Sequence, residues 1–165
     1  MRNHKKALIP ILVILVTLSV CVPVRAAETV TTYNSIDENL GVWNTLYNRA
    51  VETWYSPGNQ KCEIVFTYTG ISQSADDYWI NLDYNGVTPG YWPYLESLKM
   101  EYRWSNTASW TYICHLDINS FDGDKGIKSA TSSILYLRFT DCDTTDGVAT
   151  TWYFGYEPYL TAYTE

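Results

Sequence analysis

The sequence contains few of the residues on which common catalytic sites depend. It has two histidines and four cysteines among 165 residues, and it contains no G-x-S-x-G, H-E-x-x-H, P-loop or cysteine–histidine pattern. The histidine beyond residue 30, His115, is predicted on the outward side of a strand, where a surface role is the ordinary one. We therefore expect a non-catalytic protein. A small glycoside hydrolase with paired carboxylates stays open as an alternative, because the fold sets the separation of such a pair.

Basic residues are also scarce, since eleven Lys and Arg stand against 18 Asp and Glu. Four of the eleven lie in residues 1–26, so residues 27–165 carry seven basic and 18 acidic side chains, a net charge of −11. Such an acidic surface repels phosphate backbones and anionic lipids, which argues against nucleic acid and membranes as partners. Neutral sugars, cationic proteins and calcium stay compatible with it.

The longest apolar run lies at the N-terminus. Positively charged residues precede a nearly unbroken apolar segment, residues 7–20, and Val24 and Ala26 occupy positions −3 and −1 of a cleavage site. This pattern predicts a signal peptide over residues 1–26 and a secreted or cell-surface protein with one domain, residues 27–165.

Two other interpretations of this apolar run stay open. A retained membrane anchor would have only about 18 apolar residues, short of a typical membrane span, and Pro10 and Pro23 interrupt them. A lipoprotein would be modified at Cys21, but Val20 is bulkier than the residue that normally precedes a lipidated cysteine.

Aromatic residues are abundant: 15 Tyr, 7 Trp and 4 Phe, all beyond residue 30. They alternate with polar residues in short runs, which is typical of strands with one buried face. Even-numbered residues are expected to face the core in the runs that start near residues 62, 78, 98 and 110, including Trp110, Tyr112, Cys114 and Leu116. Together with runs near residues 28, 135 and 152, this predicts six to eight strands in an all-β antiparallel β-sandwich or jelly roll.

Some segments carry mixed or turn signals. Residues 35–55 are ambiguous, because Ser35 followed by Glu38 is a helix-capping signature while Gly41 and many β-forming residues argue against a helix. Asn85-Gly86 and Asp122-Gly123 are expected to form turns.

Cysteines Cys62, Cys114 and Cys142 follow the predicted signal peptide. Cys62 and Cys114 both fall on the inward side of their strands, so in an exported protein they could form a disulfide. The alternative is that they are buried small apolar side chains that do not pair.

The segment IKSATSSILYLRFTDCDTTDGVATTWYFGYEPYL, Ile127 to Leu160, resembles the closing hairpin of galactose-binding-like β-sandwich modules, and EIVFTYTG, Glu63 to Gly70, looks like an earlier strand of them. The resemblance implies a sandwich and an accessory or surface role, and it carries no catalytic residues. Gly155 stands where such modules often have Asp. If that Asp pairs with the strand arginine, Arg138 needs another partner, for which Glu157 is a candidate.

Two groups of residues are candidates for ligand binding. Tyr91, Trp92 and Tyr94 lie in a loop braced by prolines, and Trp79 is predicted on an outward strand face beside Asn81 and Asp83. Aromatic rings can pack on the C–H faces of sugars, while Asn and Asp bind sugar hydroxyls. Alternatively, the rings cover the core or contact a protein partner.

Acidic loops are candidates for a structural calcium site. Asp141, Asp143 and Asp146 precede Gly147, and a second run of Asp and Asn lies between Asp117 and Gly126. Calcium prefers six to eight oxygen ligands, but neither run has the EF-hand spacing, and Asp and Gly are also ordinary turn residues. The sequence therefore predicts a non-catalytic binding module, for a glycan first and otherwise for a surface protein in an adhesive or structural role.

Overall fold

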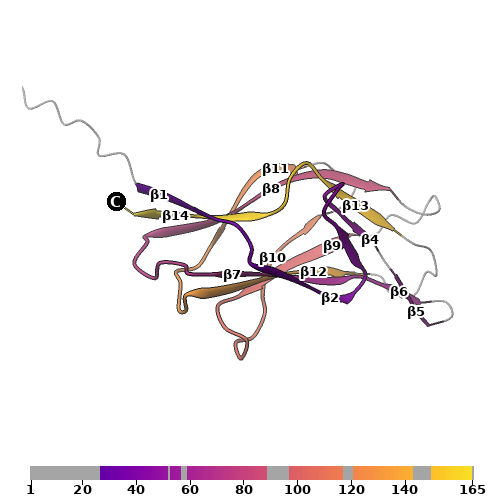
Figure 1. Cartoon of the computed structure of the whole chain (residues 1–165), viewed down its shortest axis with the longest axis horizontal. Coiled ribbons are helices and arrows are strands. Elements are labelled where there is room, and N and C mark those ends of the chain that lie inside the picture. The colour runs from indigo at the N-terminus through magenta and orange to yellow at the C-terminus, as the bar shows by residue number, and fades with distance from the viewer. Residues whose placement is uncertain are drawn as a thin grey trace, which may run out of the picture.

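A computed structural model shows that the chain forms two packed antiparallel β-sheets, an all-β sandwich (Figure 1). It describes residues 27–51, 53–56, 59–88, 97–116, 121–142 and 150–164. All regular structure in these residues is strand. Accordingly, no helix that is long and apolar enough to span a membrane occurs among them.

The larger sheet, sheet A, has seven strands, and the smaller sheet, sheet B, has five. Sheet A contains β1 (Ala27–Thr31), β3 (Val42–Asn44), β4 (Arg49–Val51), β8 (Asp77–Thr88), β11 (Phe121–Ile127), β13 (Thr151–Phe154) and β14 (Tyr159–Thr164). Sheet B contains β2 (Ser35–Leu40), β7 (Glu63–Thr69), β9 (Leu98–Arg103), β10 (Thr111–Leu116) and β12 (Ile134–Asp141). A separate two-stranded sheet pairs β5 (Thr53–Ser56) with β6 (Asn59–Lys61).

The long strand β8 organises sheet A. Strands β14 and β13 pair with its first and last parts, and β11 pairs with residues 78–84. Because β14 and β11 share partners on β8, they lie on opposite sides of it, and β11 is an edge strand. Sheet B has the order β10-β9-β12-β7-β2, so β10 is also an edge strand. Strands β10 and β11 contact each other, and the two edges therefore meet on one side of the sandwich.

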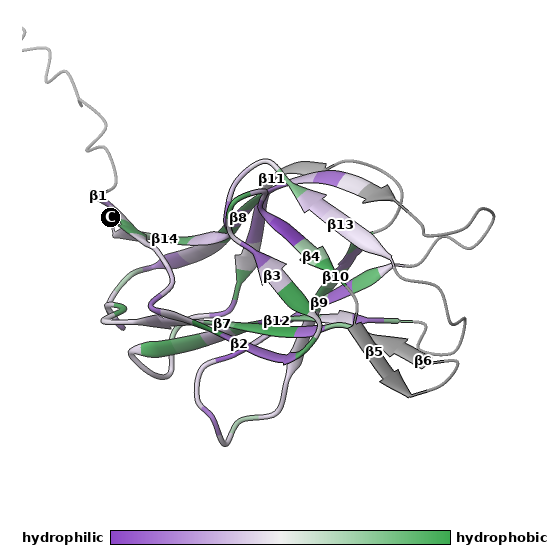
Figure 2. Ribbon diagram, turned by 45° about the vertical axis from the view of Figure 1, so that its right-hand side comes forward, coloured by the Kyte–Doolittle hydropathy of each residue, from purple (hydrophilic) through white to green (hydrophobic). Residues whose placement is uncertain are grey.

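The core lies between the sheets and is rich in aromatic rings. The even-numbered residues of β8, from Tyr78 to Tyr84, are at most 1% exposed. Phe66 of β7 is fully buried and makes edge-to-face contacts with Tyr33, Trp43 and Phe139. Partly exposed and buried side chains alternate along β12 and β13. The short strands β3 and β4 each have a hydrophilic and a hydrophobic end, and their hydrophobic ends are paired (Figure 2). The inward rows expected for the runs near residues 62, 78 and 98 are thus confirmed.

The ambiguous segment, residues 35–55, is extended and not helical in its described part. Glu38 does not close a capping box, and its Oε1 instead accepts a hydrogen bond from the backbone nitrogen of Trp43, 2.9 Å away. Gly41 separates β2 from β3 with a φ of 88°, and a Cβ at this position would lie 2.8 Å from the carbonyl oxygen of Val51. Only glycine fits this conformation and this close approach without strain.

The turns expected at Asn85-Gly86 and Asp122-Gly123 are wrong, because both pairs lie inside strands β8 and β11. Gly86 has a φ of 107° and lies where the pairing of β8 with β13 shifts register. Gly123 has a φ of 147° and pairs with Leu82. A glycine with positive φ serves bulges and distorted strands as well as turns, and the dipeptide alone does not distinguish these cases.

The inward row predicted on β10 is wrong for Trp110 and Tyr112. The register shifts between Tyr112, which pairs with Glu101, and Cys114, which pairs with Met100. This bulge at Ile113 moves the preceding residues to the opposite face, so Tyr112 is 55% exposed. Beyond the bulge, Leu116 is buried as expected.

Candidate functional site

Trp79 lies on the outer face of sheet A, as its odd position on β8 predicts. Its side chain is 36% exposed, and its neighbours across the strands are Thr161 of β14 and Gly126 of β11. A Cβ at Gly126 would lie 3.3 Å from Trp79 Cζ3, so the indole lies directly over this glycine. Because Gly126 has no side chain, the Trp79 ring can pack directly against the backbone of the sheet.

The two polar residues predicted beside Trp79 are on the same face but are engaged in the structure. Asn81 is 6% exposed and donates its Nδ2 to Thr161 Oγ1 at 2.7 Å. Asp83 is half-buried, and its carboxylate lies where a side chain at position 155 would have to be placed. Trp79 is thus the most accessible of the three side chains.

A cleft of about 280 Å³ opens between the edge strands β10 and β11. Its lining includes Tyr112, Asp124, Gly126 and Lys128, and Gly126 is the residue over which Trp79 lies. Sequence reasoning missed Tyr112 as an exposed residue because the bulge on β10 has no clear sequence signal. Asp124 belongs to the acidic run that the sequence offers as a candidate calcium loop, and it lies in strand β11, where it lines this cleft.

Internal hydrogen bonds hold the wall of the cleft. The backbone of Lys128 donates to Tyr102 Oη at 3.1 Å and accepts from Trp104 Nε1 at 3.1 Å. Deeper in the edge, Cys114 is half-buried, and burial raises the pKa of its thiol while nearby Lys125 lowers it by less. The walls of the cleft are therefore strands and a backbone segment at Lys128 that hydrogen bonds hold in place. Such walls give a ligand a rigid surface.

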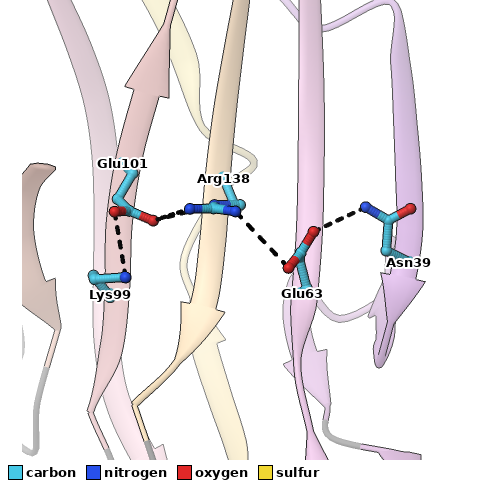
Figure 3. A network of polar contacts seen from close by, with 5 residues as sticks. All are labelled: Asn39, Glu63, Lys99, Glu101 and Arg138. Carbon is cyan, nitrogen blue, oxygen red and sulfur yellow. Dashed lines mark hydrogen bonds and ion pairs between the residues drawn. The ribbon is translucent and has the colours of Figure 1, made fainter. Parts of the chain in front are cut away.

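The outer face of sheet B carries a polar network that crosses four strands (Figure 3). Arg138 binds Glu101 through Nε at 3.1 Å and through Nη2, and its Nη1 lies 3.9 Å from Glu63. Lys99 lies 3.3 Å from Glu101, and Asn39 donates to Glu63 at 3.0 Å. These pairs link β9, β12, β7 and β2 side by side.

Glu157 is not the partner of Arg138, contrary to the expectation from the resemblance. It accepts a hydrogen bond from Tyr33 Oη at 2.9 Å, and Arg138 faces Glu101 instead. The expected closing hairpin is also wrong, because β12 belongs to sheet B and β13 to sheet A. The connection between these strands crosses from one sheet to the other.

The predicted disulfide between Cys62 and Cys114 does not form, although both side chains lie on the inward side of sheet B. Cys114 pairs with Met100, Met100 with Phe139, and Phe139 with Ile64, two residues from Cys62. The two cysteines are thus three strand spacings apart, about 14 Å at 4.8 Å per spacing. A disulfide requires Cα atoms within about 7 Å. Facing the same core is therefore not enough to bring two cysteines into bonding distance.

Several predicted site residues lie outside the described part of the chain: Tyr91, Trp92, Tyr94, Asp143 and Asp146. Their roles stay predictions. Asp141, the remaining candidate calcium ligand, ends β12 and is 6% exposed. Among the residues that the structure describes, no group of three or more His, Cys, Asp or Glu is arranged to hold a metal ion.

The two packed antiparallel sheets agree with the β-sandwich that the resemblance implies. The segments on which it rests are strands: LYLRF lies in β12, TWYF in β13 and EIVFTYT in β7. No protein-family model matches the chain, and no curated protein matches it in sequence.

Proposed function

We propose that this protein is a secreted or cell-surface, non-catalytic module of the galactose-binding-like kind that binds carbohydrate at the edge between β10 and β11. One observation supports this proposal above the others. Of the three aromatic side chains that are widely exposed in the described residues, Tyr112 lines the cleft and Trp79 lies over Gly126, which also lines it, while Tyr47 is not among the lining residues. Two exposed rings beside one cleft are a suitable platform for a sugar chain.

The groups around the cleft match the chemistry of a glycan. A sugar presents C–H faces to the rings of Trp79 and Tyr112, and its hydroxyls need hydrogen-bond partners. Asp124 accepts and Lys128 donates such bonds from the lining of the cleft. Binding sites for small ligands commonly combine apolar walls with a few polar groups in this way.

A single acidic residue among the described lining residues of the cleft favours binding over hydrolysis. Glycoside hydrolysis generally uses two carboxyl groups about 5 to 9.5 Å apart on either side of the scissile bond. Asp124 is the only acidic residue among those that line the cleft in the described part of the chain. An adhesive or structural protein stays the second candidate, because exposed Trp and Tyr are also enriched where proteins bind each other.

A glycan array with the purified protein, in calcium and in chelator, tests the proposal. We expect hits that weaken at least about tenfold in both Trp79→Ala and Tyr112→Ala, the loss of about 1.4 kcal/mol. Tyr47→Ala is the matched control, since Tyr47 is 59% exposed but lies in the turn between β3 and β4. An array without hits, or hits that depend equally on Tyr47, would favour the adhesive protein instead.

A further inference from the structure

The outer face of sheet B presents two arginines in contrasting environments. Arg138 is bound by Glu101 and Glu63, as described above. Arg103, on β9, makes no ion pair or hydrogen bond with its side chain in the described part of the chain, and its Nε is buried without a hydrogen-bond partner. Arg138 thus completes a polar network, whereas the N–H groups of Arg103 are free to bind an acceptor.

Aromatic rings fix the position of the Arg103 guanidinium. Its Cζ lies 4.3 Å from the centre of the Trp110 ring and 5.1 Å from that of Tyr136. Trp110 also covers Arg138, whose Cζ is 4.2 Å from the same ring. The rings hold Arg103 by cation–π contacts but accept none of its hydrogen bonds, so the planar donor fork is oriented in advance for an acceptor.

The charges near Arg103 favour an anionic ligand, although the chain as a whole is acidic. The outer face of sheet B carries three cations, Lys99, Arg103 and Arg138, and three carboxylates, Glu63, Glu101 and Asp37, of which Asp37 lies on β2 at the opposite edge of the sheet from β10. Glu63 and Glu101 both bind Arg138, and Glu101 also binds Lys99. Arg103 is the cation left over, and a carboxylate would fit its fork through two parallel hydrogen bonds.

We propose that Arg103, Trp110 and Tyr136 bind the carboxylate of a uronic acid residue in an acidic polysaccharide. A polysaccharide suits this place better than a peptide strand, because β9 lies between β10 and β12 and pairs with both, so that no backbone groups are left for strand addition. A uronic acid joins a carboxylate to a sugar ring, and the exposed ring of Tyr112 lies beside Glu101 on the same face. Arg103, Trp110 and Tyr136 do not line the edge cleft, which shares only Tyr112 with this site. Binding of an acidic sugar at Arg103 therefore does not depend on a neutral glycan in the cleft.

Calorimetric titration of the purified protein with oligogalacturonate tests this site, and the methyl ester of the same oligomer is the uncharged control. We expect the acid to bind at least about tenfold more tightly than the ester, since charge-assisted bidentate hydrogen bonds are among the strongest polar contacts. Arg103→Gln should abolish that preference. Arg103→Lys should keep only part of it, because lysine retains the charge but not the fork.

Lys99→Gln is the matched control, because it removes one positive charge from the same face of the same strand. We expect its affinity for the acid to stay within about threefold of the original, an effect typical of an exposed charge pair. Equal losses of affinity in Arg103→Gln and Lys99→Gln would overturn the proposal. Absence of binding to the acid, equal affinity for acid and ester, or tighter binding of a polyglutamate peptide would also overturn it.

Thermal unfolding checks that each variant is folded. If Arg103→Gln does not fold, Arg103→Lys still tests the role of the guanidinium. Arg103→Gln should bind neutral glycans as the original protein does, so this measurement tests the edge cleft independently of Arg103.

Discussion

The indole of Trp79 lies over Gly126, 3.3 Å from the place where a Cβ would be at that position. Gly126 has no unusual φ that would exclude other residues, so its small size is what this contact requires. The relationship connects the outer face of sheet A to the edge cleft, because the same glycine lines that cleft. It also permits a test of the glycan site that leaves the aromatic residue in place.

We expect Gly126→Ala to shift the Trp79 ring by a few tenths of an ångström and Gly126→Val to displace it. Glycan affinity should fall in the order glycine, alanine, valine, with a loss of at least about tenfold for valine, which corresponds to about 1.4 kcal/mol. Tryptophan fluorescence of each variant, measured with and without ligand, checks that the ring has moved. Full affinity in Gly126→Val with a displaced ring would show that Trp79 is not a platform for the ligand.

Gly155 and Asp83 form a second contact that needs a glycine. A Cβ at position 155 would lie 1.8 Å from Asp83 Oδ2, far inside van der Waals distance. We expect Gly155→Ala to lower the free energy of unfolding by about 1 to 3 kcal/mol, the usual cost of overpacking.

Denaturant unfolding of Gly155→Ala, Asp83→Ala and the double variant separates this clash from other effects. The double variant should be more stable than the sum of the single changes predicts, because Asp83→Ala removes the atoms that collide. Simple additivity would show that the carboxylate of Asp83 is not the obstacle, and that another neighbour, such as Asn85 Nδ2 at 3.1 Å from the same Cβ position, excludes the side chain.

Alternation along the strands was sufficient to predict the sandwich, the inward rows of β7, β8 and β9, and the outward position of Trp79. What it could not predict depends on contacts between segments distant in sequence. The bulge that turns Tyr112 outward is set by the pairing of β10 with β9. The role of Gly86 inside β8 depends on β13, more than 60 residues later. Single-sequence periodicity does not contain this information.

The same reason explains the outcome for the cysteines, and thiol chemistry can check it. Cys142 is exposed, Cys114 is half-buried with a raised pKa, and Cys62 is 1% exposed. Thiolates are the reactive form, so iodoacetamide at neutral pH should modify Cys142 first and Cys114 more slowly. The difference in alkylation rate between Cys142 and Cys114 should become smaller as the pH rises.

Unfolding without reductant, followed by alkylation and mass spectrometry, should label Cys62, Cys114 and Cys142 alike. A species in which Cys62 and Cys114 resist alkylation until a reductant is added would mean that the disulfide forms after all. Its formation would require β7 and β10 to approach each other, because the register separates them by two intervening strands.

The buried hydroxyl of Tyr68 should make the free energy of unfolding fall at alkaline pH. Its side chain is fully buried, its hydroxyl donates to the carbonyl oxygen of Pro158 at 2.8 Å, and burial raises its pKa well above 10.0. In the unfolded chain the phenol ionises near its ordinary pKa of about 10. The folded state therefore binds more protons than the unfolded state above that pH, and stability is lost as the pH rises.

Denaturant unfolding between pH 7 and pH 11 checks this prediction, with Tyr68→Phe as the test and Tyr47→Phe, at an exposed tyrosine, as the control. At pH 7, Tyr68→Phe should lose about 1 kcal/mol with its hydrogen bond. Above pH 10, its free energy of unfolding should fall less steeply than that of the original protein, so that the two curves converge, while Tyr47→Phe should follow the original throughout. Parallel curves for Tyr68→Phe and the original would mean that other groups cause the alkaline loss, and that the buried hydroxyl of Tyr68 contributes only its hydrogen bond.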